Sequence, residues 1–217
     1  ALHREMALYR GWAASFDTLY IGGGTPSVLP EGDLEGLIAD IRTAFTIAAG
    51  AEITVEANPA DITEGLLASL RRSGVNRLNI GVQSFDDDSL ALLGRRHTAL
   101  QAIGAIQRVR DAGFENIGLD LIYGLPSSPA GGANGDMMPH RVPICSHLTT
   151  WLATLDTAIS LDPDHLSCYQ LTLEEKTPLA KRCRRGEFIL PDESRQADFF
   201  HRTAQILEES GYCHYEV

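Results

Sequence analysis

The sequence predicts an α/β domain built around a parallel sheet. Short apolar segments with β-favouring residues alternate with longer segments whose apolar residues recur every three or four positions. The short segments are apolar throughout, as expected for strands buried on both faces. About five strands can be identified along the 217 residues, which suits one domain. An open doubly wound sheet and a closed or partial barrel both satisfy this alternation.

The alternation begins with a helix. Apolar residues at three- or four-residue spacing predict this helix over Leu2–Phe16. The apolar segment Thr18–Ile21 predicts a strand that ends at three glycines. An apolar stripe from Leu34 to Phe45 predicts the second helix. Because a β/α repeat opens with a strand, we expect at least one strand to be missing before the first helix.

The same patterns predict the remaining elements, and glycines follow several of the helices as C-terminal caps. The predicted strands are Glu52–Ala57, Asn76–Val82, Asn116–Tyr123 and His165–Leu173. The predicted helices are Thr63–Ser73, a short helix before Arg95, Leu100–Ala112, His147–Ser160 and Asp192–Ser210. The stretch Ser127–Ser146 is rich in Gly, Pro, Ala and Ser, and it is predicted to be a flexible insertion in a single domain over residues 1–217.

Charge and hydropathy exclude several function classes. The net charge of -11 argues against nucleic acid or an anionic membrane as a partner of the whole surface. No apolar run reaches the roughly 18 residues that a membrane span needs, so no membrane span is expected. The first residue is Ala1 rather than Met, and the chain looks like the interior of a longer protein. We expect a cytoplasmic protein, or an organellar one if the full-length chain has a transit peptide.

The four cysteines do not predict a metal site. Cys145, Cys168, Cys183 and Cys213 are far apart, and none belongs to a C-x-x-C pattern. Structural zinc sites and iron–sulfur clusters need closely spaced thiolates. We therefore expect free, reduced thiols and no metal ligands on this chain.

Polar or glycine-rich residues follow each predicted strand, at positions 22–26, 56–59, 83–85, 120–126 and 169–172. The carboxyl ends of parallel strands meet at one rim, where ligands of β/α folds bind. These residues are therefore expected to form a site for a small polar ligand. Glycines 22 to 24 would let the backbone approach that ligand closely, and Thr25 adds a hydroxyl. A tight turn without a ligand would need the same glycines, and the Walker A and G-x-G-x-x-G patterns are not met.

Several polar side chains within or after the strands have two interpretations each. Glu56 and Asp120 lie in apolar strands, where an unpaired carboxylate is costly, so each is expected to contact a ligand or to form an ion pair. A ribose diol would suit Glu56 as a ligand. Gln83 would bind an amino acid or a purine, or be a satisfied strand-end amide. Arg95 would clamp a carboxylate, whereas His97 is favoured as a core or surface histidine.

Six motifs, in order, resemble those of one known family. They are Ile21–Ser27, Glu56–Pro59, Asn79–Phe85, Leu93–His97, Leu119–Pro126 and Leu166–Thr172. Together they resemble the radical S-adenosylmethionine (SAM) family of oxygen-independent coproporphyrinogen III oxidases, and most closely its heme chaperone branch. The resemblance spans nearly the whole chain apart from the insertion. It implies a partial (β/α) barrel of radical SAM type with parallel strands, whose first strand and C-terminal domain are missing here.

The resemblance also implies cofactors. Family members bind S-adenosylmethionine through a [4Fe-4S] cluster on a C-x-x-x-C-x-x-C loop, which is absent from these residues. By motif match, the methionine end would be held by Gly23, Gly24 and Thr25, the ribose by Glu56, and other parts of the cofactor by Gln83, Arg95, Asp120 and, more weakly, Thr172. Either the chain starts after the cluster loop, which we favour, or the protein has lost its cluster. This chain is expected to hold no cluster itself.

Three functions are compatible with this resemblance. The first is a heme chaperone-like protein that binds heme or porphyrin and passes heme to an acceptor protein; the Tyr-Gln-Leu-Thr and Gln-Ser-Phe forms favour it. The second is an oxygen-independent coproporphyrinogen III oxidase, which decarboxylates propionate side chains oxidatively. The third is a cluster-free remnant without catalysis. The sequence leaves open whether the protein is an enzyme and predicts no catalytic residue.

Overall fold

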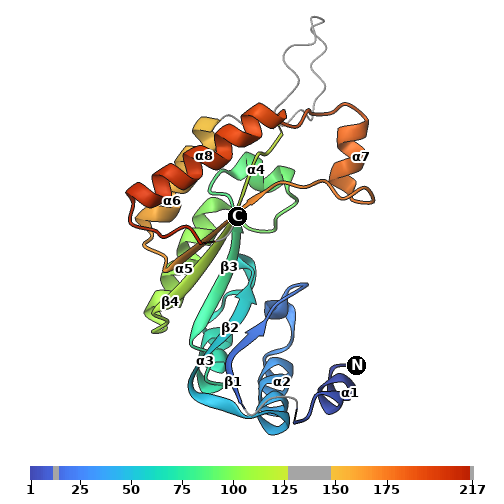
Figure 1. Ribbon diagram of the computed structural model, residues 1–217, viewed down its shortest axis with the longest axis vertical. Coiled ribbons are helices and arrows are strands. Elements are labelled where there is room, and N and C mark those ends of the chain that lie inside the picture. Colours follow the sequence, from blue (N-terminus) through green and yellow to red (C-terminus); the bar gives the residue numbers. More distant parts are fainter. Residues whose placement is uncertain (12–14, 127–147, 216–217) are drawn as a thin grey trace, which may run out of the picture. The chain divides into compact units, whose positions relative to one another are not determined.

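Five strands form one sheet in the computed structural model, which describes residues 1–11, 15–126 and 148–215. The strands are β1 (Phe16–Ile21), β2 (Ile47–Ala57), β3 (Arg77–Gln83), β4 (Asn116–Tyr123) and β5 (His165–Gln170). They are parallel and pair in chain order, β1-β2-β3-β4-β5 (Figure 1). A helix joins each strand to the next, as the sequence pattern predicted. The predicted insertion at Ser127–Ser146 lies outside the described residues.

The described residues form eight α-helices and two 3-10 helices. The α-helices are α1 (Leu2–Leu8), α2 (Glu31–Ala44), α3 (Glu64–Arg72), α4 (Asp87–Leu92), α5 (Ala99–Asp111), α6 (Leu148–Ser160), α7 (Pro178–Arg184) and α8 (Glu193–Glu209). The 3-10 helices are η1 (Pro26–Val28) and η2 (Pro59–Asp61). Side-chain caps fix several starts: the Asp192 carboxylate, for example, accepts a hydrogen bond from the Arg195 amide at 2.9 Å.

The prediction for the first helix is wrong at its C-terminal end. Instead of Leu2–Phe16, α1 ends at Leu8, and Phe16 begins β1. Gly11 has a φ of 78°, a left-handed conformation that a continuing helix does not contain. The ring of Phe16 packs edge-on against that of Phe45, with ring centroids 5.5 Å apart. Phe16 therefore fitted the apolar stripe because its half-buried ring packs against Phe45, not because it lies on a helix.

Other elements also differ from the prediction. Strand β2 starts earlier than predicted, at Ile47, and β5 ends earlier, at Gln170. Helix α7 was not predicted. Its sequence signal is present, because the Thr177 hydroxyl accepts a hydrogen bond from the Ala180 amide at 3.2 Å and Pro178 occupies the first helical position.

The chain divides into two compact units, each with its own core. Unit 1 comprises Ala1–Gly81, Ile103–Leu119 and Pro163–His165; unit 2 comprises Val82–Ala102, Asp120–Asp162 and Leu166–Val217. In unit 1 the core contains fully buried side chains of β2, β3 and β4, among them Val55, Leu78 and Ile117. In unit 2 the helices α6 and α8 lie side by side (Figure 1), and the Trp151 indole of α6 donates to the Thr203 hydroxyl of α8 at 2.7 Å.

Gly118→Ala is expected to destabilise unit 1. Gly118 is buried in β4, and a Cβ there would collide with Oδ1 of Asn79 in β3. We expect the free energy of unfolding, measured by urea denaturation, to fall by about 1–3 kcal/mol. Gly104→Ala in α5 is the matched control: its Cβ would meet only Nη1 of Arg108, at 3.4 Å, and alanine favours helix by about 1 kcal/mol. Equal losses in the two variants would contradict the packing argument.

Candidate functional site

The glycine turn after β1 packs directly against a carboxylate at the end of β2. Ile21 pairs with Val55 in the parallel register, so the next position on each strand places Gly22 beside Glu56. A Cβ on Gly22 would lie 2.6 Å from Oε1 of Glu56. Only glycine fits this position while the carboxylate keeps its place.

The backbone of the turn holds the Glu56 carboxylate. The Gly23 amide donates a hydrogen bond to Oε2 at 3.1 Å, and the Tyr20 hydroxyl donates to Oε1 at 2.8 Å. Gly23 and Gly24 have left-handed φ angles of 78° and 62°, and a Cβ on either would meet open space. An ionised carboxylate has about four lone-pair positions, so Glu56 keeps acceptor capacity for a ligand. Among the described residues no arginine forms an ion pair with Glu56.

The loops after β1 and β2 are also tied together behind the glycine turn. Thr25 is half-buried and directly precedes η1. The Ser27 hydroxyl donates to Oδ2 of Asp61 at 2.9 Å and accepts from the Asn58 amide at 3.0 Å. Sequence reasoning missed Ser27 and Asp61, because neither stands at a strand end and their hydrogen bond spans 34 residues. This bond fixes the two loops that present the turn.

Strand β3 ends in a strained turn at Gln83. Gln83 is 8% exposed and has a φ of 71°, a left-handed conformation that is uncommon outside glycine. The Ser84 amide donates to the Val82 carbonyl at 2.9 Å, which closes a three-residue γ-turn around Gln83. Such strain persists only where surrounding structure enforces it, and it is concentrated at functional sites.

A cation and an anion interact electrostatically near the ends of β3 and β4. Arg95, in the loop after α4, interacts electrostatically with Asp120 of β4. Burial lowers the pKa of Arg95, and Asp120 opposes this shift. The Arg95 Nε is buried and has no hydrogen-bond partner within the part of the chain that the structure describes. A buried donor of this kind is costly unless a ligand or water satisfies it.

Cys168 of β5 belongs to the same neighbourhood. Burial, with a smaller contribution from Asp120, raises the pKa of its thiol to about 12. The thiol is therefore protonated at neutral pH. Cys168, Cys183 and Cys213 are free, as expected, and Cys145 lies outside the described residues.

The structure brings the predicted site residues together in two sets. Gly23 contacts Glu56 in unit 1, and Arg95 interacts with Asp120 in unit 2. Thr172 is exposed, two residues beyond the end of β5. The convergence of all the strand ends on one rim stays a prediction.

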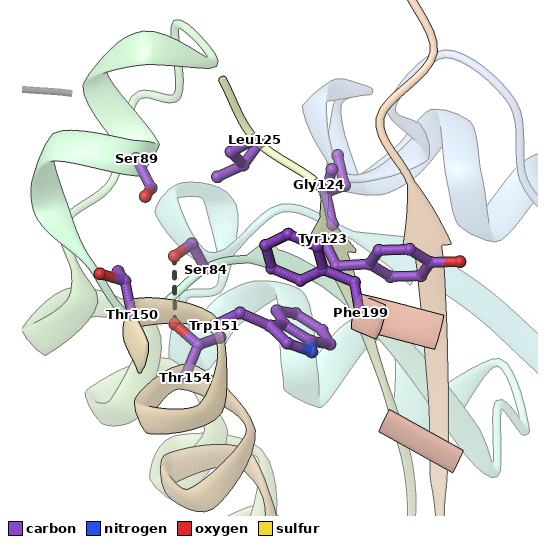
Figure 2. Close-up of a pocket in the computed structure, with 10 residues that line it drawn as sticks. Ser84, Ser89, Tyr123, Gly124, Leu125, Thr150, Trp151, Thr154 and Phe199 are labelled. Carbon is purple, nitrogen blue, oxygen red and sulfur yellow. Dashed lines mark hydrogen bonds between the residues drawn. The ribbon is translucent and has the colours of Figure 1, made fainter. Parts of the chain in front are cut away.

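Unit 2 also contains a small pocket that the sequence did not predict. Its volume is about 20 Å³, room for about one water molecule. Figure 2 shows the rings of Tyr123, Trp151 and Phe199 on one side and the hydroxyls of Ser84 and Thr154 on the other. The pocket is too small for an organic ligand, and its lining residues include side chains of α6, α8 and the end of β4.

The arrangement fits a small polar ligand better than a metal cluster. The left-handed glycines and Glu56 form an open cradle with a backbone amide and a carboxylate, which suits a ligand with hydroxyl or ammonium groups. No group of three or more His, Cys, Asp or Glu side chains that could hold a metal ion exists among the described residues. The described residues thus fit S-adenosylmethionine but supply no ligand set for an iron–sulfur cluster.

The chain is thus a parallel α/β domain with a glycine turn and a carboxylate at neighbouring strand ends, where ligands of such folds bind. The model of the radical SAM superfamily matches residues 2–129. The chain therefore belongs to the radical SAM superfamily.

Three similar proteins indicate the branch within that superfamily. The chain is 39% identical to heme chaperone HemW of Lactococcus lactis over 92% of its length and 48% of that protein. It is 38% identical to heme chaperone HemW of Escherichia coli, over 92% of this chain and 47% of that protein. It is 32% identical to bovine radical S-adenosyl methionine domain-containing protein 1, mitochondrial, over 93% of this chain and 41% of that protein. The chain spans about half the length of the curated relatives it matches.

Solved structures confirm the predicted fold class. Coproporphyrinogen III oxidase (HemN) from Escherichia coli, a radical SAM enzyme, superposes with a TM-score of 0.77 at 28% identity, over 98% of this chain and 45% of that one. An archaeal Elp3 shares the fold at 18% identity, with a TM-score of 0.71, over 94% of this chain and 49% of that one. The chain has the α/β fold of the radical SAM partial barrel. None of its described helices is both long and apolar enough to cross a membrane.

The unfolding free energy is expected to decrease as the pH falls below 6.5, because of His97. This histidine is 3% exposed, and burial lowers its pKa from the ordinary 6.5; Arg95 and Arg96 lower it further, while the Val82 carbonyl and Asp87 oppose them. The unfolded chain then binds the proton more readily than the folded chain, so stability is lost as the pH falls through 6.5 towards the folded-state pKa.

Urea midpoints at about pH 7.5 and about pH 5.5 measure this loss. His97→Phe lacks the titrating group and should show a smaller difference between the two midpoints. The same difference in both proteins would show that another group causes it.

Proposed function

We propose that the strand-end residues of this chain bind S-adenosylmethionine. The observation that carries the proposal is the pairing of Gly23 with Glu56 across β1 and β2. The Glu56 carboxylate has free acceptor positions for the two ribose hydroxyls. The open backbone at Gly23 and Gly24, with the hydroxyl of Thr25, suits the amino and carboxylate groups of the methionine end.

The family motifs assign further cofactor contacts to residues of unit 2. Gln83, at its strained turn, and Arg95, with an unsatisfied buried Nε, would make further contacts with the cofactor. Asp120 would hold Arg95 in place, and Thr172 would contribute backbone groups beyond β5. When bound, S-adenosylmethionine supplies the radical chemistry of the superfamily. This chain's own residues bind and orient it.

For the whole protein we propose a heme chaperone-like function in heme metabolism. The names of the bacterial relatives, at 38% and 39% identity, support this assignment. The proposed partners are heme or porphyrin and a heme-acceptor protein. The proposed compartment is the cytoplasm, or an organelle if the whole protein has a transit peptide; the bovine relative's name places that protein in mitochondria.

Gly22→Ala tests the S-adenosylmethionine site. The new Cβ would push the Glu56 carboxylate out of its place, so we expect binding of S-adenosylmethionine to weaken at least about tenfold, the value of a charge-assisted hydrogen bond. Isothermal titration calorimetry on the full-length protein measures the dissociation constant. Gly32→Ala is the matched control, because a Cβ at position 32 meets nothing within 4 Å. Equal affinities for the wild type and Gly22→Ala would refute the proposed site.

The second candidate function is oxygen-independent coproporphyrinogen III oxidase. The superposition with the Escherichia coli enzyme, at a TM-score of 0.77, favours it. Anaerobic iron reconstitution of the full-length protein, followed by assays of heme binding and coproporphyrinogen consumption, separates the two functions. We expect stable heme binding without coproporphyrinogen consumption. Turnover of coproporphyrinogen would establish the oxidase instead. A protein that binds neither iron nor heme would be a cluster-free remnant.

A further inference from the structure

The backbone turn at Gln83 is held by groups from distant parts of unit 2. With a φ of 71°, Gln83 leaves the extended conformation of β3. Side chains alternate between the two faces of a regular strand. The left-handed turn removes Gln83 from this alternation. The direction of the Gln83 side chain therefore depends on whatever keeps the turn in its left-handed conformation.

His97 supports the turn from one side. Its Nε2 lies 3.0 Å from the Val82 carbonyl, which also accepts from the Ser84 amide at 2.9 Å. Because a carbonyl can only accept, the neutral ring must have its proton on Nε2. His97 is 3% exposed, so this hydrogen bond is shielded from water. The imidazole thus fixes the carbonyl that closes the γ-turn around Gln83.

Thr154 of α6 supports the turn from the other side. Its hydroxyl accepts a hydrogen bond from the Phe85 amide at 3.3 Å and lies 3.3 Å from the Ser84 hydroxyl (Figure 2). The Ser84 hydroxyl in turn accepts from the Asp86 amide at 3.1 Å. Ser84 and Thr154 are each 3% exposed. Ser84 and Phe85, which follow Gln83, are therefore held by α6, which is far away in the sequence.

We propose that His97 and Thr154 are positioning residues that clamp the turn and so present Gln83 to the cofactor of the strand-end site. The inference rests on the proposed function, because Gln83 is assigned there to S-adenosylmethionine. Neither His97 nor Thr154 contacts the cofactor in this proposal. Each acts through the backbone on either side of Gln83.

Two substitutions of matched volume remove one support each. His97→Phe fills the ring space without a donor, and Thr154→Val removes the hydroxyl at nearly constant size. In the full-length protein, each should weaken binding of S-adenosylmethionine about five- to tenfold by calorimetry, corresponding to one lost hydrogen bond. The conservative variants His97→Gln and Thr154→Ser, which keep a donor and a hydroxyl, should remain within about twofold of the wild type.

Thr203→Val separates positioning from general stability. It breaks the buried hydrogen bond between Trp151 and Thr203 in the same unit and removes none of the hydrogen bonds that His97 and Thr154 make to the turn. We expect it to lower the melting temperature and to leave the dissociation constant unchanged, when binding is measured well below the melting transition. If His97→Phe behaves like Thr203→Val, the role of His97 is structural only and the proposal is wrong.

Gln83→Ala separates this inference from the proposed function. If Gln83→Ala leaves the affinity for S-adenosylmethionine unchanged, Gln83 is not a cofactor contact and the assignment of the site is at fault. If Gln83→Ala weakens binding and His97→Phe does not, the site assignment stands and the clamp is refuted.

The tautomer of His97 provides a readout that is independent of binding. The ¹⁵N spectrum of the imidazole in the ligand-free protein should show the proton on Nε2. A proton on Nδ1 alone would leave no donor for the Val82 carbonyl and would overturn the proposal.

Discussion

The contact between the glycine turn after β1 and the Glu56 carboxylate depends on the register of β1 and β2. Because Ile21 pairs with Val55, the carboxylate takes the space that a side chain at position 22 would occupy. The Gly23 amide then points at the carboxylate rather than at solvent. A slip of one residue would turn the glutamate to the other face of the sheet and remove the contact. Every cofactor contact proposed in unit 1 depends on this register.

Unit 2 also contains energetically unfavourable features at its strand ends. Gln83 has a left-handed backbone, and Arg95 is a partly buried cation whose Nε lacks a partner within the described residues. Asp120 compensates part of the burial of Arg95. The well-packed core beneath, with Tyr123, Trp151 and Phe199, makes such costs tolerable. Backbone strain and buried polar groups without hydrogen-bond partners are expected at strand ends that bind a ligand.

Much of the fold could be predicted because the signals are local. All five strands and most helices follow from apolar periodicity, and β4 has the predicted bounds, Asn116–Tyr123. The pattern failed at Phe16, which fits a helical stripe by spacing but begins β1 and packs against Phe45. Periodicity reports which positions are apolar, and it does not report where a helix loses its packing partner.

The sequence by itself determined the parallel α/β class and predicted candidates at strand ends such as Gly23 and Glu56. These follow from residue type and from the position of each residue relative to a strand. Only the tertiary structure decided that Gly23 donates to Glu56 and that Thr154 supports the turn at Gln83. The hydrogen bond between Ser84 and Thr154 joins residues 70 positions apart. Such partners are selected by the packing of helices on strands, a spatial relation that residue spacing along the chain does not encode.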